Sequence, residues 1–162
     1  MALILNGDTG ITYPVATATG SATQASAGRV LQVVNATFST NFSTASATFV
    51  STGASVTITP SNSSNNVAIF VLGGHMNTDA SGKQGFLTLY RGATNIGATS
   101  GMVQFYSQSG GNNQTDATFG GYDSPATTSA TTYTVYMKTN TNSMTYNNDS
   151  NKITLLAMEI SA

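Results

Sequence analysis

Apolar and polar residues alternate one by one in several short segments of the chain, from about residue 29 onward. In residues 55–59, Val56 and Ile58 alternate with serine and threonine, and residues 132–138 repeat the pattern. A period of two places alternate side chains on opposite faces of a strand, so the pattern predicts β-strands with one buried face. Further strands are predicted at residues 29–39, 86–92 and 102–108.

Two other segments are continuous apolar runs, VAIFVL at residues 67–72 and ITLLAMEI at residues 153–160. Such runs are typical of strands buried on both faces, so we predict that they are the central strands of a sheet. Both runs are far too short to span a membrane. We expect the core to contain Val56, Ile58, Ile69, Val71, Leu87, Leu89, Phe105, Val135, Ile153, Leu155 and Met158.

Clusters of asparagine, serine, glycine and aspartate separate the predicted strands, at residues 60–66, 77–82, 109–113 and 147–151. These residue types favour tight turns because they accept unusual backbone angles or hydrogen-bond their own backbone. No segment shows the 3.6-residue period of a helix. Short strands at this spacing predict an all-β fold, a jelly-roll-like antiparallel β-sandwich.

The first 28 residues differ from the rest, and we divide the chain into an N-terminal arm at 1–28 and a sandwich domain at 29–162. After Pro14 the arm consists of small residues that cannot form a core of their own. We expect it either to lie along a neighbouring subunit or to pack as an edge strand on its own domain. In the first case its anchor is Leu3, Ile4 and Leu5.

Charged residues make up only 7% of the 162 residues, with five basic and six acidic side chains and a net charge of −1. The basic residues are dispersed, which argues against a nucleic-acid-binding surface. The chain has no cysteine and a single histidine, His75, so we expect no metal site within one chain. An ion held by three copies of His75 on a trimer axis is the alternative, and a rim histidine is the simpler interpretation.

The acidic residues occur singly, mostly in turn-like contexts, and we expect no catalytic residue. The spacing leaves open a pair of carboxylates brought together from distant strands, as a glycoside hydrolase needs. Among the aromatic residues, most are expected in the core. Tyr106 and Tyr136 are candidates to face outward, where they would suit an interface or a sugar-binding surface.

A series of longer segments runs through the chain: MALILNGDTGI, RVLQVV, SVTITPSNSSNNVAIFVLG, LTLYRGATNIG, YDSPATTSATTYTVYMKT and ITLLAMEI. In this order they resemble small tail-fibre and virion structural proteins of tailed phages, especially those of marine and cyanobacterial hosts. The resemblance covers most of residues 1–162. It implies a compact jelly roll resembling the trimeric tumour-necrosis-factor head, and membership of a virion rather than an active site. The shaft that a long fibre needs is missing from the sequence.

The resemblance therefore implies a non-enzymatic structural protein on the exterior of the phage particle, assembled in the host cytoplasm. We expect a homotrimeric capsid decoration (cement) protein whose partners are its own copies and the major capsid protein or tail proteins. The alternative is a short tail fibre or fibre tip that binds a host receptor or surface glycan. A polysaccharide-degrading enzyme is the least favoured reading. No cofactor, nucleic acid or membrane is expected as a partner.

Overall fold

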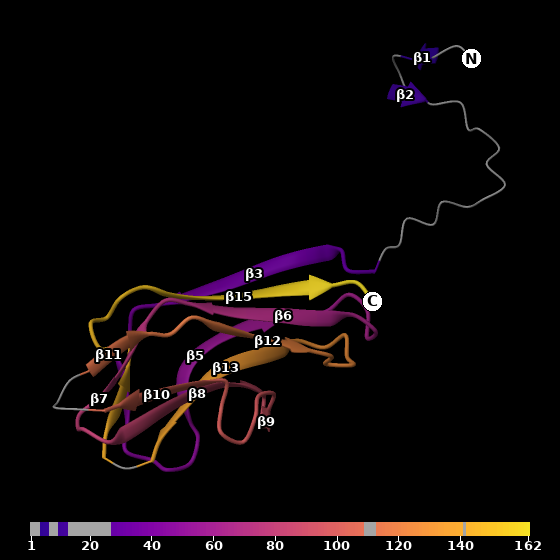
Figure 1. Ribbon diagram of the computed structural model, residues 1–162. Coiled ribbons are helices and arrows are strands. Elements are labelled where there is room, and N and C mark those ends of the chain that lie inside the picture. The colour runs from indigo at the N-terminus through magenta and orange to yellow at the C-terminus, as the bar shows by residue number, and fades with distance from the viewer. Residues whose placement is uncertain (1–3, 7–9, 13–26, 109–112, 141) are drawn as a thin grey trace.

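The computed structural model describes residues 4–6, 10–12, 27–108, 113–140 and 142–162, and all regular structure in them is β-strand (Figure 1). Neighbouring strands are antiparallel throughout. The prediction of an all-β antiparallel fold is therefore confirmed. In this part of the chain no helix is found that is long and apolar enough to cross a membrane.

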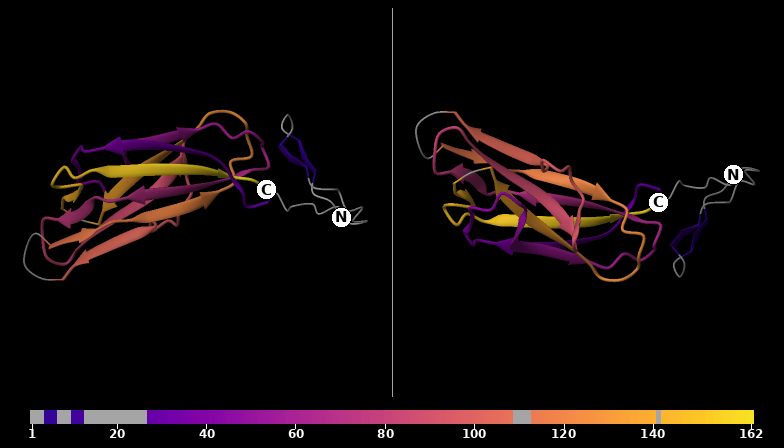
Figure 2. Two further views of the ribbon diagram at one scale, coloured as in Figure 1. Left: turned by 90° about the horizontal axis from the view of Figure 1, so that it is seen from above. Right: turned by 90° about the horizontal axis from the view of Figure 1, so that it is seen from below.

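Two sheets form the layers of a sandwich, as the views from above and below also show (Figure 2). We name each after one of its edge strands. The β3 sheet has the order β12 (Phe119–Asp123), β6 (Asn66–Leu72), β15 (Ile153–Ile160) and β3 (Val30–Phe38). The β5 sheet has the order β10 (Val103–Ser107), β8 (Lys83–Arg91), β13 (Thr131–Thr139) and β5 (Val50–Ile58), and the short β9 (Thr94–Asn95) also pairs with β8.

The order of the eight long strands is that of a jelly roll. Numbered along the chain, the β3 sheet contains the sixth, third, eighth and first of these strands. The β5 sheet contains the fifth, fourth, seventh and second. Two interlocked Greek keys produce this arrangement, in which most connections cross from one sheet to the other. The predicted jelly roll is thus confirmed by the topology itself.

A third, small sheet lies in the four connections at one end of the sandwich, on the left in Figure 1. It has the order β11 (Asn113–Asp116), β7 (His75–Thr78), β14 (Met144–Tyr146) and β4 (Phe42–Thr44). Each of its strands lies between a long strand of one layer and a long strand of the other. No strand was predicted from the sequence for these four segments, so the small sheet is a correction to the predicted elements.

The core lies between the two layers and is built from the inward side of each strand. Nine of the eleven predicted core side chains are fully buried, among them Ile69, Leu87 and Leu155. Phe105 is only partly buried and packs against the edge of the core. Met158 was predicted wrongly, because its neighbours Ala157 and Glu159 take the inward positions of β15.

The two apolar runs do occupy central positions of the β3 sheet, but they are buried on one face only. In β6, Ile69 and Val71 are fully buried, whereas Phe70 and Leu72 are each 41% exposed. In β15 the same alternation runs between buried and half-buried positions. The prediction of burial on both faces is therefore wrong for the single chain, and the apolar outward positions need another explanation.

Residues 1–28 are described only in part. A short antiparallel pair, β1 (Ile4–Asn6) and β2 (Gly10–Thr12), is formed within them. Of the predicted anchor, Leu3 lies outside the described residues, and only the backbone of Ile4 and Leu5 is described. At the predicted domain boundary, the Gly28 amide donates a 2.8 Å hydrogen bond to the Ser161 carbonyl. The arm's attachment role remains a prediction.

Candidate functional site

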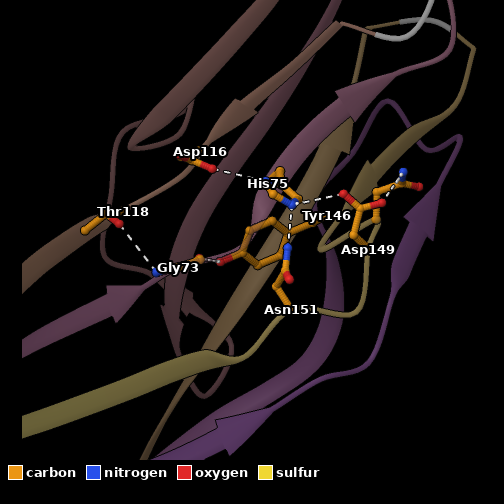
Figure 3. Close-up of polar contacts among 8 residues, drawn as sticks. Gly73, His75, Asp116, Thr118, Tyr146, Asp149 and Asn151 are labelled. Atoms are coloured by element: carbon orange, nitrogen blue, oxygen red, sulfur yellow. Dashed lines mark hydrogen bonds and ion pairs between the residues drawn. The ribbon is translucent and has the colours of Figure 1, made fainter.

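His75 lies at the centre of a polar cluster in the small sheet, between the side chains of two aspartates (Figure 3). Its Nδ1 is 3.0 Å from Oδ1 of Asp116, the residue directly opposite it on β11. Its Nε2 is 3.2 Å from Oδ2 of Asp149 and 2.6 Å from Nδ2 of Asn151, both in the connection between β14 and β15. The cluster thus joins β7, β11 and that connection.

Two consecutive glycines place the histidine. Gly73 and Gly74 both have positive φ, 88° and 86°, a region that side chains with a Cβ rarely adopt. A Cβ on Gly74 would also lie 2.8 Å from the ring of Tyr146. The Tyr146 hydroxyl donates a 3.0 Å hydrogen bond to the Gly73 carbonyl, and burial raises the pKa of this hydroxyl. The chain therefore turns tightly out of β6 and brings His75 opposite Asp116.

The chemistry of the cluster is that of a structural tie. With its proton on Nδ1, the ring donates to Asp116, and Nε2 accepts from the Asn151 amide. When both ring nitrogens are protonated, Nδ1 still donates to Asp116, and Nε2 donates to Asp149 instead of accepting from Asn151. Both ring nitrogens are therefore occupied by protein groups. A nucleophilic mechanism needs a hydroxyl or thiol within hydrogen-bond reach of the base, and the described contacts of the ring include none.

The carboxylates beside His75 contact different ring nitrogens, so they do not converge on one point as metal ligands must. Within the described residues, no group of three or more His, Asp or Glu side chains could hold a metal ion. Asp116 is largely exposed, with 90% of its side-chain surface accessible, and Asp149 is 53% exposed. The idea of an ion shared by three His75 side chains depends on a trimer and remains a prediction.

Glu159 is the one carboxylate that is completely buried among the described residues. Its oxygens accept hydrogen bonds from the side chains of Asn65 and Gln32, each at 2.6 Å. The backbone amide and the hydroxyl of Ser61 also donate to it, each at 2.7 Å. Burial alone would raise the pKa of Glu159, but these hydrogen bonds outweigh it and lower the pKa to about 2. The carboxylate ties the turn between β5 and β6 to β15.

A second ionic group, which is partly buried, joins the two layers. Arg91 of β8 donates from one nitrogen to both oxygens of Asp123 of β12, at 3.0 and 2.9 Å. The Tyr133 hydroxyl of β13 donates to the same carboxylate at 2.8 Å. Burial raises the pKa of Tyr133 most. The hydrogen bond to Asp123 and the negative charge of Asp123 raise this pKa further, while the charge of Arg91 lowers it. Both oxygens of the Asp123 carboxylate accept hydrogen bonds from strands of the other layer, so the group holds the two sheets together.

The carboxylate pair that a glycoside hydrolase needs is not assembled by the described acidic residues. Asp123 and Glu159 are each held by structural partners, and Asp116 and Asp149 lie on two sides of one imidazole. Asp79 accepts a 3.3 Å hydrogen bond from the Ser143 amide. A surface hollow is lined by Thr37, Phe38, Ser39 and Lys152, and it contains no carboxylate.

The outward aromatic side chains lie mainly as the alternation predicts. Tyr106 of β10 is 47% exposed. Tyr136 of β13 is half-buried, and its ring stacks on that of Tyr90 with centroids 3.9 Å apart. On the other sheet, Tyr122 of β12 is 61% exposed, more than any other large apolar or aromatic side chain described. The sequence analysis did not single out Tyr122, because β12 has two glycines and no clear alternation.

Comparison with known proteins gives a remote likeness in structure. No family model and no curated protein matches the chain. Structures of the VP2 protein of infectious bursal disease virus are similar to it: a mutant VP2, a VP2 subviral particle and the Gx strain. Their identities are 14%, 16% and 16%, and their TM-scores 0.40, 0.38 and 0.39. They match 82%, 82% and 81% of this chain.

The chain spans less than two fifths of these structures, 37%, 38% and 37% of their lengths. At these TM-scores the likeness carries no argument about function. The class of the protein is instead defined by its own strand order, which is that of a single jelly-roll domain.

The sequence analysis missed Glu159 and Asp123 as structural centres. A signal for Glu159 was present, because one acidic residue interrupts an otherwise apolar run at residues 153–160. A carboxylate in such a position must be partnered to be buried. Its partners could not be named, since Gln32 in β3 and Asn65 in the turn before β6 lie far away in the sequence.

Proposed function

We propose that this chain is a non-enzymatic structural protein on the exterior of a phage particle, a homotrimeric decoration (cement) protein that stabilises the capsid shell. The observation that carries the proposal is the jelly-roll strand order combined with an outer surface that is poor in charge. The described ionisable groups inside the domain are tied to structural partners. Such a domain offers surfaces for contact with other proteins rather than a reactive centre.

The sequence resemblance to phage virion proteins points the same way, and it extends over the segments that form β3, β5, β6, β8, β13 and β15. A near-neutral surface gains little solubility from self-repulsion and suits a permanent assembly. Closing three copies around an axis buries a surface on each of them without leaving an open chain of contacts. We expect the partners to be the chain's own copies and the major capsid protein.

A short tail fibre or fibre tip is the second candidate, favoured by the exposed Tyr106 on β10. Amphipathic rings on a surface suit contact with a host receptor or glycan. The two candidates differ in where the protein lies on the particle, and the alternative also requires direct binding to host cells.

Antibody labelling of the purified virion tests both candidates. Particles of the phage that encodes the chain are incubated with gold-labelled antibody to this protein and imaged in negative stain, with pre-immune antibody as control. Gold on the capsid is the expected result. Gold confined to the tail would replace the decoration proposal with the fibre-tip proposal. If particles carry no gold and the chain is also absent from denatured virions, the virion role is refuted.

A further inference from the structure

The outward side chains of the β3 sheet form an apolar face that the chain itself leaves uncovered. Val33 of β3 is 51% exposed, and Phe70 and Leu72 of β6 are each 41% exposed. Each alternates along its strand with more buried residues, so each points away from the core. The half-buried Leu156 of β15 lies beside Phe70, in register, and belongs to the same face.

We propose that this apolar face is the surface through which copies of this chain pack against one another. The inference deepens the self-association that the proposed function includes, by naming the surface and its occupant. We define the face by the outward positions of the four strands: Leu31, Val33, Asn35, Thr37, Asn66, Ala68, Phe70, Leu72, Gly120, Tyr122, Thr154, Leu156, Met158 and Ile160.

The face contains no charged residue. A neighbouring copy that packs against this face therefore meets no charged side chain on it, and no ion of the face has to be buried without a partner. Of its polar members, Asn35, Thr37 and Thr154 lie together toward one end of the face because Thr154 pairs with Thr37, and Asn66 lies at the other end, opposite Ile160. The rest of the face is aliphatic or aromatic.

The opposite layer is different, which shows that the apolar face is not a general property of the fold. The outward positions of β13 include Thr132, Thr134 and Lys138. The hydroxyl of Thr132 is hydrogen-bonded to that of Thr57 at 2.8 Å, and the Lys138 ammonium donates to the Thr99 carbonyl at 3.0 Å. A surface with this composition is stable in water, whereas an extended apolar one marks an interaction site.

Large and small side chains lie next to each other across the strands of the apolar face. Gly120 of β12 is the cross-strand partner of Phe70, and Tyr122 is the partner of Ala68. In each pair the aromatic ring protrudes from the surface, and the small residue beside it leaves a recess. A neighbouring copy can place its side chains into such recesses, and this is the interdigitation by which sheet faces pack.

The size of the face agrees with a stable contact between copies. Four strands about 4.8 Å apart, with about eight residues at roughly 3.3 Å each, give about 500 Å² of flat area. Side chains add relief to this area, which brings it near the roughly 800 Å² per partner of a standard interface. A small ligand would cover only a fraction of it, so the occupant is another protein surface, and its charge and shape point to a second copy.

Replacing Phe70 by lysine tests the inference, with Tyr106→Lys as the matched control. Both positions are exposed aromatic residues, 41% and 47%, but Tyr106 lies on the opposite layer. We expect sedimentation equilibrium to show an oligomer for the full-length chain and for the Tyr106 variant. For Phe70→Lys we expect the dissociation constant to rise at least about 100-fold, because an unpaired lysine would be buried in the contact.

A second variant, Val33→Lys, tests the same face from another strand and is informative if Phe70→Lys does not fold. Circular dichroism establishes the folding of each variant. A wild-type chain that sediments as the 16.6 kDa monomer at micromolar concentration overturns the inference. So does an oligomer that the folded variants at the apolar face leave intact, or that Tyr106→Lys disrupts equally.

Thiol protection provides an independent readout, since the chain has no cysteine of its own. In Val33→Cys we expect the introduced thiol to react with a maleimide at least about ten times more slowly in the oligomer than at dissociating dilution. In Tyr106→Cys we expect equal rates, and equal rates in both variants contradict the inference. If the wild type is a dimer that Phe70→Lys dissociates, the apolar face is the contact surface but the proposed trimer is refuted. Virions that the antibody does not label would refute the virion role alone and leave this inference standing.

Discussion

The carboxylate of Glu159 accepts a 2.6 Å hydrogen bond from the side chain of Asn65, and both residues are buried. The two residues lie 94 positions apart in the sequence, one at the turn before β6 and the other near the end of β15. The Asn65 side chain also accepts a hydrogen bond from the Ala162 amide at 3.2 Å. This pair therefore fixes the C-terminal end of the domain to the turn between β5 and β6.

The low pKa of Glu159 predicts how stability depends on acid. Its folded value of about 2 lies below the unfolded value of 4.5, so the folded state favours the charged form. The contribution is fully present above pH 4.5 and is lost as the pH falls through about 2. The shift corresponds to about 3 kcal/mol. We expect urea titrations to show this loss for the wild type and a flatter profile for Glu159→Gln, and identical profiles would contradict the prediction.

Asp123→Asn should destabilise the domain by about 2–4 kcal/mol, because Arg91 loses its counter-charge and one of the two acceptor oxygens becomes an NH2 donor in a partly buried site. Tyr133→Phe removes only the hydroxyl and should cost about 1 kcal/mol. Chemical denaturation gives both values. If the two substitutions have equal effects, the Arg91 contact contributes nothing and the ionic bridge between the layers is ruled out.

Ile69→Ala should lower the free energy of unfolding by about 2–5 kcal/mol, because the side chain is fully buried in the core between the layers. Gln104→Ala on the outward side of β10 is the control, with an expected change within about 0.5 kcal/mol. Thermal or chemical denaturation of both variants at the same protein concentration makes the comparison. Equal changes would mean that β6 contributes no core.

His75→Ala should have a small global effect, about 1 kcal/mol or less, because its aspartate partners are exposed. The local effect should be larger. The connection between β14 and β15 loses the contacts of Asp149 and Asn151, so its amides should exchange with deuterium faster. Asp79→Ala is the control, because Asp79 contacts Ser143 and should leave exchange in the connection between β14 and β15 unchanged. If exchange in that connection is also unchanged in His75→Ala, the His75 cluster does not order the connection.

Removal of residues 1–26 should leave the thermal unfolding transition in place, because this deletion keeps the hydrogen bond from Gly28 to Ser161. We expect the shortened chain to occupy fewer sites on particles, since an arm gains its order from contacts with neighbours. Changing Leu3, Ile4 and Leu5 to serine should reproduce most of the loss. Loss of the thermal transition would make the segment part of the fold, and full occupancy would exclude the attachment role.

The strands with clear alternation could be predicted from the sequence, and so could the jelly-roll class. Residues 55–59 and 132–138 lie in β5 and β13, and the inward side chains Val56 and Val135 are buried as expected. The apolar run of β6 was wrongly predicted to be buried on both faces, because apolar composition does not distinguish a face buried in the core from an exposed apolar face. Periodicity reports which side chains share a face, but not what covers it.

The small sheet and the ionic centres could not be predicted in the same way. Strands of three or four residues, such as β7 and β14, are too short for a period to show. Their pairing depends on connections that only the complete topology brings together. The partners of Glu159 and Asp123 likewise come from other strands or from the turn between β5 and β6, so the sequence identifies the charge but not what compensates it.

The position of β15 has a consequence for the order of events during synthesis. Among the described strands, β3, the first of the sandwich, pairs only with β15, the last, and Phe38 is opposite Ile153. Pairings between such distant segments are slow to form because a long loop must close first. A nascent chain therefore cannot complete this sheet before Ile160 has left the ribosome. The surface that we assign to contact between copies is assembled last, which delays association until each chain is complete enough to fold.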